Sequence, residues 1–147
     1  MVRVDEKVPG LQLELGGVPE DAPIRGELLF ESVVEGILVS GPISGRLAQS
    51  CARCLREFEV DLGIEVQELF TADAGPGGEE YPLSSGGFID IEPMVRDAVL
   101  LAMPFSPLCR PDCLGLCERC GGDRNLGECT CAPEAVDPRW AALDNLF

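Results

Sequence analysis

The stretch "CARCLREFEVDLGIEVQELF", residues 51–70, decides the fold of this chain. Over residues 58–66 it alternates apolar residues with acidic residues or glycine at a period of two. Such alternation is typical of an antiparallel strand with one face in the core and the other in water. The Cys-x-x-Cys of residues 51–54 comes just before it, which predicts a tight turn between two antiparallel strands. We expect the buried side chains to be Phe58, Val60, Leu62, Ile64 and Val66.

Further strand patterns precede this stretch. Residues 11–15 alternate strictly, and residues 24–30 and 32–41 are rich in apolar and β-branched side chains. Residues 43–50 then lead into Cys51. The Gly41-Pro42 pair predicts a turn between the last two of these strands.

The strongest helix signal lies between Pro93 and Pro104. Proline suits the first turn of a helix, Asp90 and Glu92 favour its positive end, and Pro104 ends it. Because this segment is so apolar, we expect the helix to pack on the open face of the sheet. The stripe at helical spacing consists of Val95, Ala98, Val99 and Ala102, widened by Leu100, Leu101 and Met103.

These patterns divide the chain into two parts. We expect residues 1–104 to form a β-rich domain with a covering helix, and the Gly- and Pro-rich residues 72–87 to be a flexible loop. Residues 105–147 would form a zinc-binding extension that ends in a short helix, in which Trp140, Leu143 and Phe147 line one side. That side would either pack the tail onto the domain or dock to a partner. The predicted class is α+β: an antiparallel β-sheet or partial β-barrel, one packed helix and a Cys-rich C-terminal extension.

The composition limits the cellular context. The chain has 147 residues, which is enough to bury a core without cysteine cross-links. No stretch approaches the roughly 20 apolar residues that cross a bilayer, and the N-terminus lacks the apolar block of a signal peptide. We therefore expect a cytoplasmic protein that does not contact membrane. In that compartment spaced cysteines are more often metal ligands or catalytic groups than disulfides.

Histidine is absent from the chain, which limits the catalytic groups and metal ligands that it offers. There is no Ser-His or Cys-His pair and no imidazole base, and no Gly-rich loop has the form of a nucleotide-binding site. We therefore expect no enzyme activity, and no small-molecule substrate is evident. A metal site in this chain would have to use thiolates, with a carboxylate as the other option.

Eight cysteines occur at spacings that suit metal binding. They form the patterns Cys51-x2-Cys54, Cys109-x3-Cys113-x3-Cys117-x2-Cys120 and Cys129-x-Cys131. Two thiolates separated by two residues can bind one zinc ion from a single turn. Gly121 and Gly122 directly follow Cys120, the second cysteine of the Cys117–Cys120 pair, and allow the left-handed backbone of a zinc knuckle.

Chain order suggests two four-cysteine sites. Cys117, Cys120, Cys129 and Cys131 are close in sequence and could close a small metal-folded tail. The remaining set, Cys51, Cys54, Cys109 and Cys113, would tie the extension to the sheet across more than fifty residues and stabilise it by several kcal/mol. We expect two zinc ions, or one if the joining site is weak.

Other interpretations of the cysteines remain open. An even number would also suit disulfides, and Cys51 and Cys54 could form a redox pair, although their motif does not open a helix. Iron is compatible with four thiolates as well, and spacing alone does not distinguish it from zinc.

The charge is strongly acidic, with 11 basic against 26 acidic residues and a net charge of −15. Ten carboxylates and no cation lie between Arg56 and Arg96. Such a surface repels nucleic acid and attracts basic partners, or it is simply a solvated face. Five arginines lie in the cysteine segments, where they would balance metal-thiolate charge or contact RNA phosphate or a protein. The candidate partner contacts are Glu59, Asp61, Glu65, Glu68, Arg53, Arg56, Arg119 and Arg124.

Four segments together resemble the YceD family of large ribosomal RNA subunit accumulation proteins. They are "CARCLREFEVDL", "FIDIEPMVRDAVLLAMPFSPLC", "CLGLCERCGGDRN" and "DPRWAALDNL", which run in order from about Cys51 to Leu146. The family's Cys-x-x-Cys falls on Cys51 and Cys54, its later cysteines on 109–131, and its Asp-Pro-Arg on 137–139. The resemblance implies a bacterial cytosolic protein, with plastid relatives, that supports accumulation of large-subunit ribosomal RNA. It implies no catalytic residues.

The sequence and the resemblance lead to one functional expectation. We expect a non-catalytic factor in large-subunit biogenesis that binds a basic ribosomal protein or a pre-ribosomal particle through its acidic face. Direct RNA binding stays open, because the chain is so acidic. The alternative is a redox-responsive zinc chaperone, in which thiol oxidation releases metal and exposes apolar surface.

Overall fold

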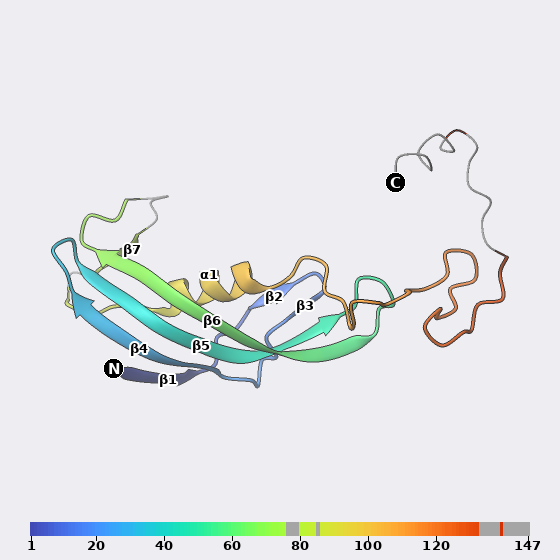
Figure 1. The fold of residues 1–147 in the computed structure, drawn as a ribbon. Coiled ribbons are helices and arrows are strands. Elements are labelled where there is room, and N and C mark those ends of the chain that lie inside the picture. The colour runs from blue at the N-terminus through green and yellow to red at the C-terminus, as the bar shows by residue number, and fades with distance from the viewer. Residues whose placement is uncertain (76–79, 85, 133–138, 140–147) are drawn as a thin grey trace.

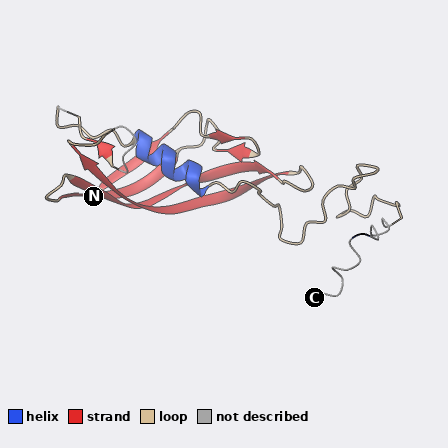
Figure 2. Cartoon of the chain, turned by 90° about the horizontal axis from the view of Figure 1, so that it is seen from above, coloured by secondary structure: helices blue, strands red, loops and turns tan. Residues whose placement is uncertain are grey.

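The fold is a curled, mostly antiparallel sheet with one helix against its inner face (Figures 1 and 2). The structure is a computed structural model that describes residues 1–75, 80–84, 86–132 and 139. Its elements are β1 (Val2–Glu6), β2 (Gln12–Leu13), β3 (Gly16–Gly17), β4 (Ile24–Ser32), β5 (Ile37–Ser50), β6 (Glu57–Thr71), β7 (Tyr81–Pro82) and α1 (Glu92–Ala102).

The sheet is organised around β5, which pairs with β3, β4 and β6. The strand order is β1-β4-β5-β3-β2, and β6 pairs with β5 along its whole length, from Ile37↔Phe70 to Ser50↔Glu57. The two-residue β7 adds to β6 in parallel, with Phe70 opposite Tyr81. The predicted α+β class and the antiparallel sheet with one packed helix are confirmed.

The β5–β6 hairpin forms as the period-two pattern predicts. Leu62, Val66 and Phe70 are buried on the inner face, whereas Glu59 and Asp61 are exposed on the outer one. Phe58 and Ile64 are partly buried beside the core. Val60 is the exception: 38% of it is exposed, so its predicted burial is wrong.

The turn predicted at Gly41-Pro42 is wrong, because β5 runs straight through these residues. Pro42 lies opposite Glu65 in β6, and on the other side the β4–β5 ladder is interrupted between Gly26↔Ile43 and Leu29↔Ser40. A proline without an N–H is tolerated at such an interruption. Gly41 has φ 144°, and a Cβ there would lie 2.3 Å from the Glu27 carbonyl oxygen. The actual turn is at residues 33–36, where Val33 and Gly36 exchange backbone hydrogen bonds.

Three short strands also differ from expectation. The alternating residues 11–15 form only the two-residue β2, because Glu14 and Leu15 turn the chain back into β3. No pattern predicted β1, which pairs with β4 from Val2↔Leu28 to Glu6↔Ile24. β7 lies within residues 72–87, which we expected to be a loop throughout.

The helix α1 begins and ends close to its predicted bounds. Proline stands in its first turn, the Asp90 carboxylate accepts a hydrogen bond from the Glu92 N–H at 3.0 Å, and Pro104 follows the helix. Met94, Val95 and Val99 form its buried side. Leu101 is 86% exposed, so its predicted place in the stripe is wrong, and Met94 packs in the core instead.

Two further expectations concern helices, one at the C-terminus and one that would cross a membrane. The predicted C-terminal helix, with Trp140, Leu143 and Phe147, lies outside the described residues. Within the described part, no helix has the length and apolar character that crossing a bilayer demands.

Candidate metal centres

The eight cysteines come together in two groups of four. The proximal cluster, beside the sheet, contains Cys51, Cys54, Cys109 and Cys113, and the distal cluster contains Cys117, Cys120, Cys129 and Cys131. Within each cluster all four sulfurs lie within 4.8 Å of one another. These are the groups expected from chain order, and each could hold one metal ion.

The sulfur–sulfur distances in the proximal cluster fit a tetrahedral thiolate site. Cys51 Sγ and Cys113 Sγ are 3.8 Å apart, and Cys54 Sγ and Cys109 Sγ are 3.6 Å apart. Four sulfurs at about 2.3 Å from a central ion would be separated by about 3.8 Å. A disulfide would require about 2.05 Å, so these thiols are not bonded in pairs.

The first Cys-x-x-Cys is held by a compact backbone turn. The Cys51 N–H donates to the Arg56 carbonyl oxygen at 2.9 Å, and the Leu55 N–H donates to the Cys51 carbonyl oxygen at 2.9 Å. Leu55 has φ 59° and is the one described non-glycine residue with positive φ. The turn thus points both thiols to the same side, at the cost of a strained leucine.

The distal cluster repeats this turn. The Cys117 N–H donates to the Gly122 carbonyl oxygen at 2.9 Å, and the Gly121 N–H donates to the Cys117 carbonyl oxygen at 2.8 Å. Gly121, at φ 72°, occupies the position that Leu55 has in the first turn. The two knuckles therefore share one backbone geometry, with glycine present only in the second.

The thiol pKa values within the proximal cluster differ widely. Burial raises the pKa of Cys51, but N–H groups of Cys109, Cys54 and Arg53 together outweigh it and lower the pKa to about 6. Burial and contact with the Cys54 sulfur raise the pKa of Cys109 to about 12. Sulfurs this close cannot all ionise unless a cation lies between them.

The distal cluster also contains one thiol with a lowered pKa and one with a raised pKa. Hydrogen bonds from the backbone N–H groups of Cys120 and Arg119 lower the pKa of Cys117 to about 6. Contact with the Cys120 and Cys129 sulfurs raises the pKa of Cys131 to about 12. The distal cluster is also less buried, since Cys120 is exposed whereas Cys51, Cys54 and Cys113 are buried.

Asn125 lies between Cys120 and Cys129 in the sequence and contacts Cys113 of the proximal cluster, and our sequence reasoning gave it no role. Its Oδ1 accepts hydrogen bonds from Arg110 Nη2 and the Leu114 N–H, both at 2.8 Å. Its Nδ2 donates to Asp123 Oδ1 at 2.7 Å and to Cys113 Sγ at 3.5 Å. Hydrogen bonds from the backbone N–H and side chain of Asn125 also lower the pKa of Asp123. The available signal was the "GGDRN" that follows Cys120.

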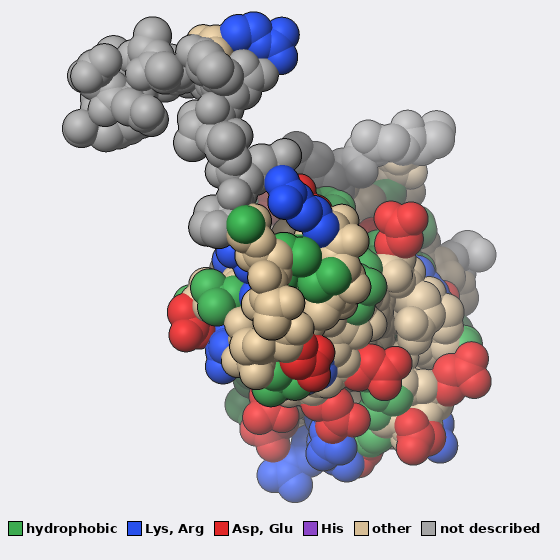
Figure 3. All heavy atoms as spheres, turned by 90° about the vertical axis from the view of Figure 1, so that its right-hand side faces the viewer, with side chains coloured by type: hydrophobic (Ala, Val, Ile, Leu, Met, Phe, Trp, Pro, Cys, Tyr) green, Lys and Arg blue, Asp and Glu red, His purple; other side chains and the backbone are tan. Residues whose placement is uncertain are grey.

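Two of the four predicted contact arginines hold the extension to the knuckle of the sheet. Arg53 Nη1 donates to the Cys113 carbonyl oxygen at 2.8 Å, and Arg56 pairs with Asp123 at 3.3 Å. Arg119 and Arg124 instead line a surface hollow beside the distal cluster. On the face seen in Figure 3, basic side chains are interspersed with apolar and acidic ones and form no continuous basic patch among the described residues.

The four predicted contact carboxylates do not share one face. Glu59, Asp61 and Glu65 are exposed on the outer face of β6. Glu68 has the opposite parity and is partly buried on the inner side, so its expected grouping with the other three is wrong. Glu59 forms an exposed ion pair with Arg46 of β5 at 3.4 Å.

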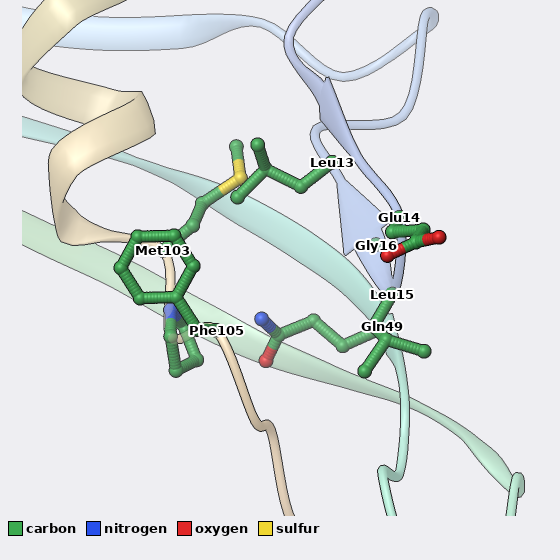
Figure 4. A pocket seen from close by; sticks show the side chains of 8 residues that line it. Leu13, Glu14, Leu15, Gly16, Gln49, Met103 and Phe105 are labelled. Carbon is green, nitrogen blue, oxygen red and sulfur yellow. The ribbon is translucent and has the colours of Figure 1, made fainter.

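A small pocket lies between the β2–β3 hairpin and the end of α1 (Figure 4). Leu13 and Met103 point toward one another across it, and Gln49 extends toward Phe105. Its volume of about 240 Å³ is below the roughly 300 Å³ at which small-molecule sites begin. Glu14 is the one ionisable group among its lining residues.

Comparison with known proteins adds a family to this geometry. The profile described as "Large ribosomal RNA subunit accumulation protein YceD" matches residues 39–147. The chain belongs to the YceD family. The match begins in β5 and includes β6, α1 and both cysteine clusters, so the family region contains both candidate metal centres.

Several relatives support this membership. An uncharacterized protein of Mycobacterium tuberculosis is 38% identical over 143 residues, covering 89% of this chain and 65% of its own length. An uncharacterized protein of Mycobacterium leprae is 31% identical, covering 100% and 71%. A maize protein named "Large ribosomal RNA subunit accumulation protein YCED homolog 1, chloroplastic" is 25% identical, covering 76% and 46%. The chain thus spans about two thirds or less of the length of most of these relatives. No solved structure matches it.

Proposed function

We propose that the chain is a non-catalytic, two-zinc factor that supports accumulation of large-subunit ribosomal RNA by binding a basic ribosomal protein or a pre-ribosomal particle. The observation that supports a role in ribosomal RNA accumulation is membership of the YceD family. The cysteine clusters and the outer face of β6 supply the physical basis for metal and partner.

Zinc is the metal that suits both clusters best. Four thiolates in a tetrahedron form a closed structural zinc site, in which no ligand position is left for water or substrate. Such an ion supplies folding free energy rather than catalysis. Residues of the proximal cluster would hold the extension to the β5–β6 turn, and those of the distal cluster would fold the extension itself.

The partner is inferred from charge. The outer face of β6 carries Glu57, Glu59, Asp61 and Glu65, and among the described residues Arg46 provides the one ion pair to this row. Four thiolates around a divalent ion carry a further net charge of −2 per site. A phosphate backbone would be repelled by such a surface, whereas a lysine- and arginine-rich protein would be attracted.

Affinity capture from a bacterial lysate, with and without ribonuclease, tests this proposal. We expect large-subunit ribosomal proteins in the captured fraction and their retention after ribonuclease treatment. A triple variant Glu59→Lys, Asp61→Lys, Glu65→Lys should lose them and keep its zinc. The matched control Glu6→Lys, Glu27→Lys, Glu31→Lys has the same net charge, but its changes lie on β1 and β4. Absence of large-subunit components from the wild-type fraction would refute the proposal.

A redox-responsive chaperone is the second candidate, and the exposure of Cys120 favours it. An exposed thiolate site is open to oxidation, which would release its metal. Mild peroxide should then release zinc from the distal cluster reversibly and produce activity that prevents aggregation of an unfolded client. Zinc release without such activity would leave the ribosomal function as the sole candidate.

A further inference from the structure

The second edge of β6 is a long strand edge without a backbone partner. One edge of this fifteen-residue strand pairs with β5, whereas the other pairs with β7 only at Phe70 and Thr71. In the described part of the chain, no other backbone pairs with that edge. Because N–H and C=O groups alternate in direction along a strand, about half of those before Phe70 face this edge.

Such an edge is a template for another strand, and proteins usually shield it. Short length, proline, bulges and charged side chains, above all lysine, are the common shields. Between Glu57 and Leu69, β6 contains no proline or lysine, its register with β5 is continuous, and its charged side chains are all carboxylates. β1 is a less suitable edge, because it has five residues and bears both Arg3 and Asp5.

We propose that this edge of β6 binds an extended, lysine- or arginine-rich peptide segment by strand addition. The inference rests on the proposed function and specifies how the basic partner is held. Main-chain hydrogen bonds would supply affinity along the edge, as in other strand-addition complexes. The exposed carboxylates of Glu59, Asp61 and Glu65 would face basic side chains on the outer face of the added strand.

The charge of β6 also selects against a second copy of the chain. Edge-to-edge pairing of two β6 strands would place two rows of carboxylates side by side, and like charges on neighbouring strands are destabilising. A basic segment replaces this repulsion with cross-strand attraction. The carboxylates therefore act as the shield against self-association and as the recognition element for a basic strand.

Backbone amide exchange with a defined probe tests the proposal. The probe is a twelve-residue peptide of alternating lysine and threonine, added to the reduced, zinc-loaded full chain and followed residue by residue by NMR. We expect alternate amides between Glu57 and Leu69 to become protected. A peptide N-methylated at every second residue keeps its charge but cannot donate along one edge. It should bind about tenfold more weakly or worse and protect none of these amides.

Variants separate edge binding from general charge attraction. Glu59→Lys, Asp61→Lys, Glu65→Lys should lose peptide binding, whereas the β1 and β4 control triple should keep it. Equal affinity for both peptides, protection away from β6, or equal loss in both triples would overturn strand addition. Capture of large-subunit proteins without any β6 protection would overturn this inference alone. Failure of that capture would instead refute the proposed function.

Discussion

Removal of ligands from the proximal cluster should destabilise the whole domain, whereas removal from the distal cluster should not. The test pair is Cys54→Ser, Cys109→Ser against Cys120→Ser, Cys129→Ser, each of which deletes half of one cluster. Serine is close to cysteine in size, so steric change is small. The difference in the free energy of unfolding between the two double variants then shows which site stabilises the sheet.

The magnitude follows from the loops that the metals close. Cys54 and Cys109 are 55 residues apart, and that loop contains β6, β7 and α1. Closing it by a cross-link corresponds to about 4 kcal/mol of chain entropy. Cys120 and Cys129 close a loop of only nine residues within the extension. Closing this loop corresponds to about 2.5 kcal/mol of chain entropy, which stabilises the extension itself. Loss of the distal site should therefore change the stability of the sheet by less than about 1 kcal/mol.

Urea unfolding of the reduced, zinc-loaded proteins, followed by the circular dichroism of the sheet, measures this difference. Hydrogen exchange should show lost protection throughout the sheet in the proximal pair, and only within residues 114–131 in the distal pair. Equal losses of sheet stability in the two variants, or no loss in either, would refute the assignment of a joining role to the proximal cluster.

Three further predictions follow from local geometry. Leu55→Gly should raise the free energy of unfolding by about 0.5 kcal/mol, because Leu55 is 62% exposed and left-handed, and urea unfolding measures this. Asn125→Ala should destabilise the extension by about 2 kcal/mol and speed transfer of metal from the site of Cys113 to a chelator, since four side-chain hydrogen bonds disappear. Protons compete with metal for thiolates, and the pKa of Cys51 and of Cys117 is lowered to about 6. Metal should therefore leave each cluster as the pH falls, because the thiols take up protons when the ion is released, and native mass spectrometry across a pH series follows this loss.

Features with a local cause were predictable from the sequence. The alternation of residues 58–66 is set by the two-residue period of a strand, so β6 and its buried side chains Leu62 and Val66 could be predicted. The same period also places Glu68 on the face opposite Glu59, a signal that our grouping by charge overlooked. The cysteines group in chain order, which is why spacing predicted both clusters.

Features that depend on tertiary packing were not predictable. Gly41-Pro42 has the composition of a turn, and only the interruption of the β4–β5 ladder allows it inside a strand. The helix is apolar on several sides, so its docking direction alone decides that Met94 is buried and Leu101 exposed. Asn125 acts through Arg110, Cys113 and Leu114, which lie together in another segment that its own sequence neighbours do not reveal.

Native mass spectrometry of the reduced protein tests most directly the claim that each cluster is a zinc site. The account predicts a folded chain with two zinc ions, one of which is lost in each cysteine pair variant. A folded, metal-free protein with eight free thiols would contradict it.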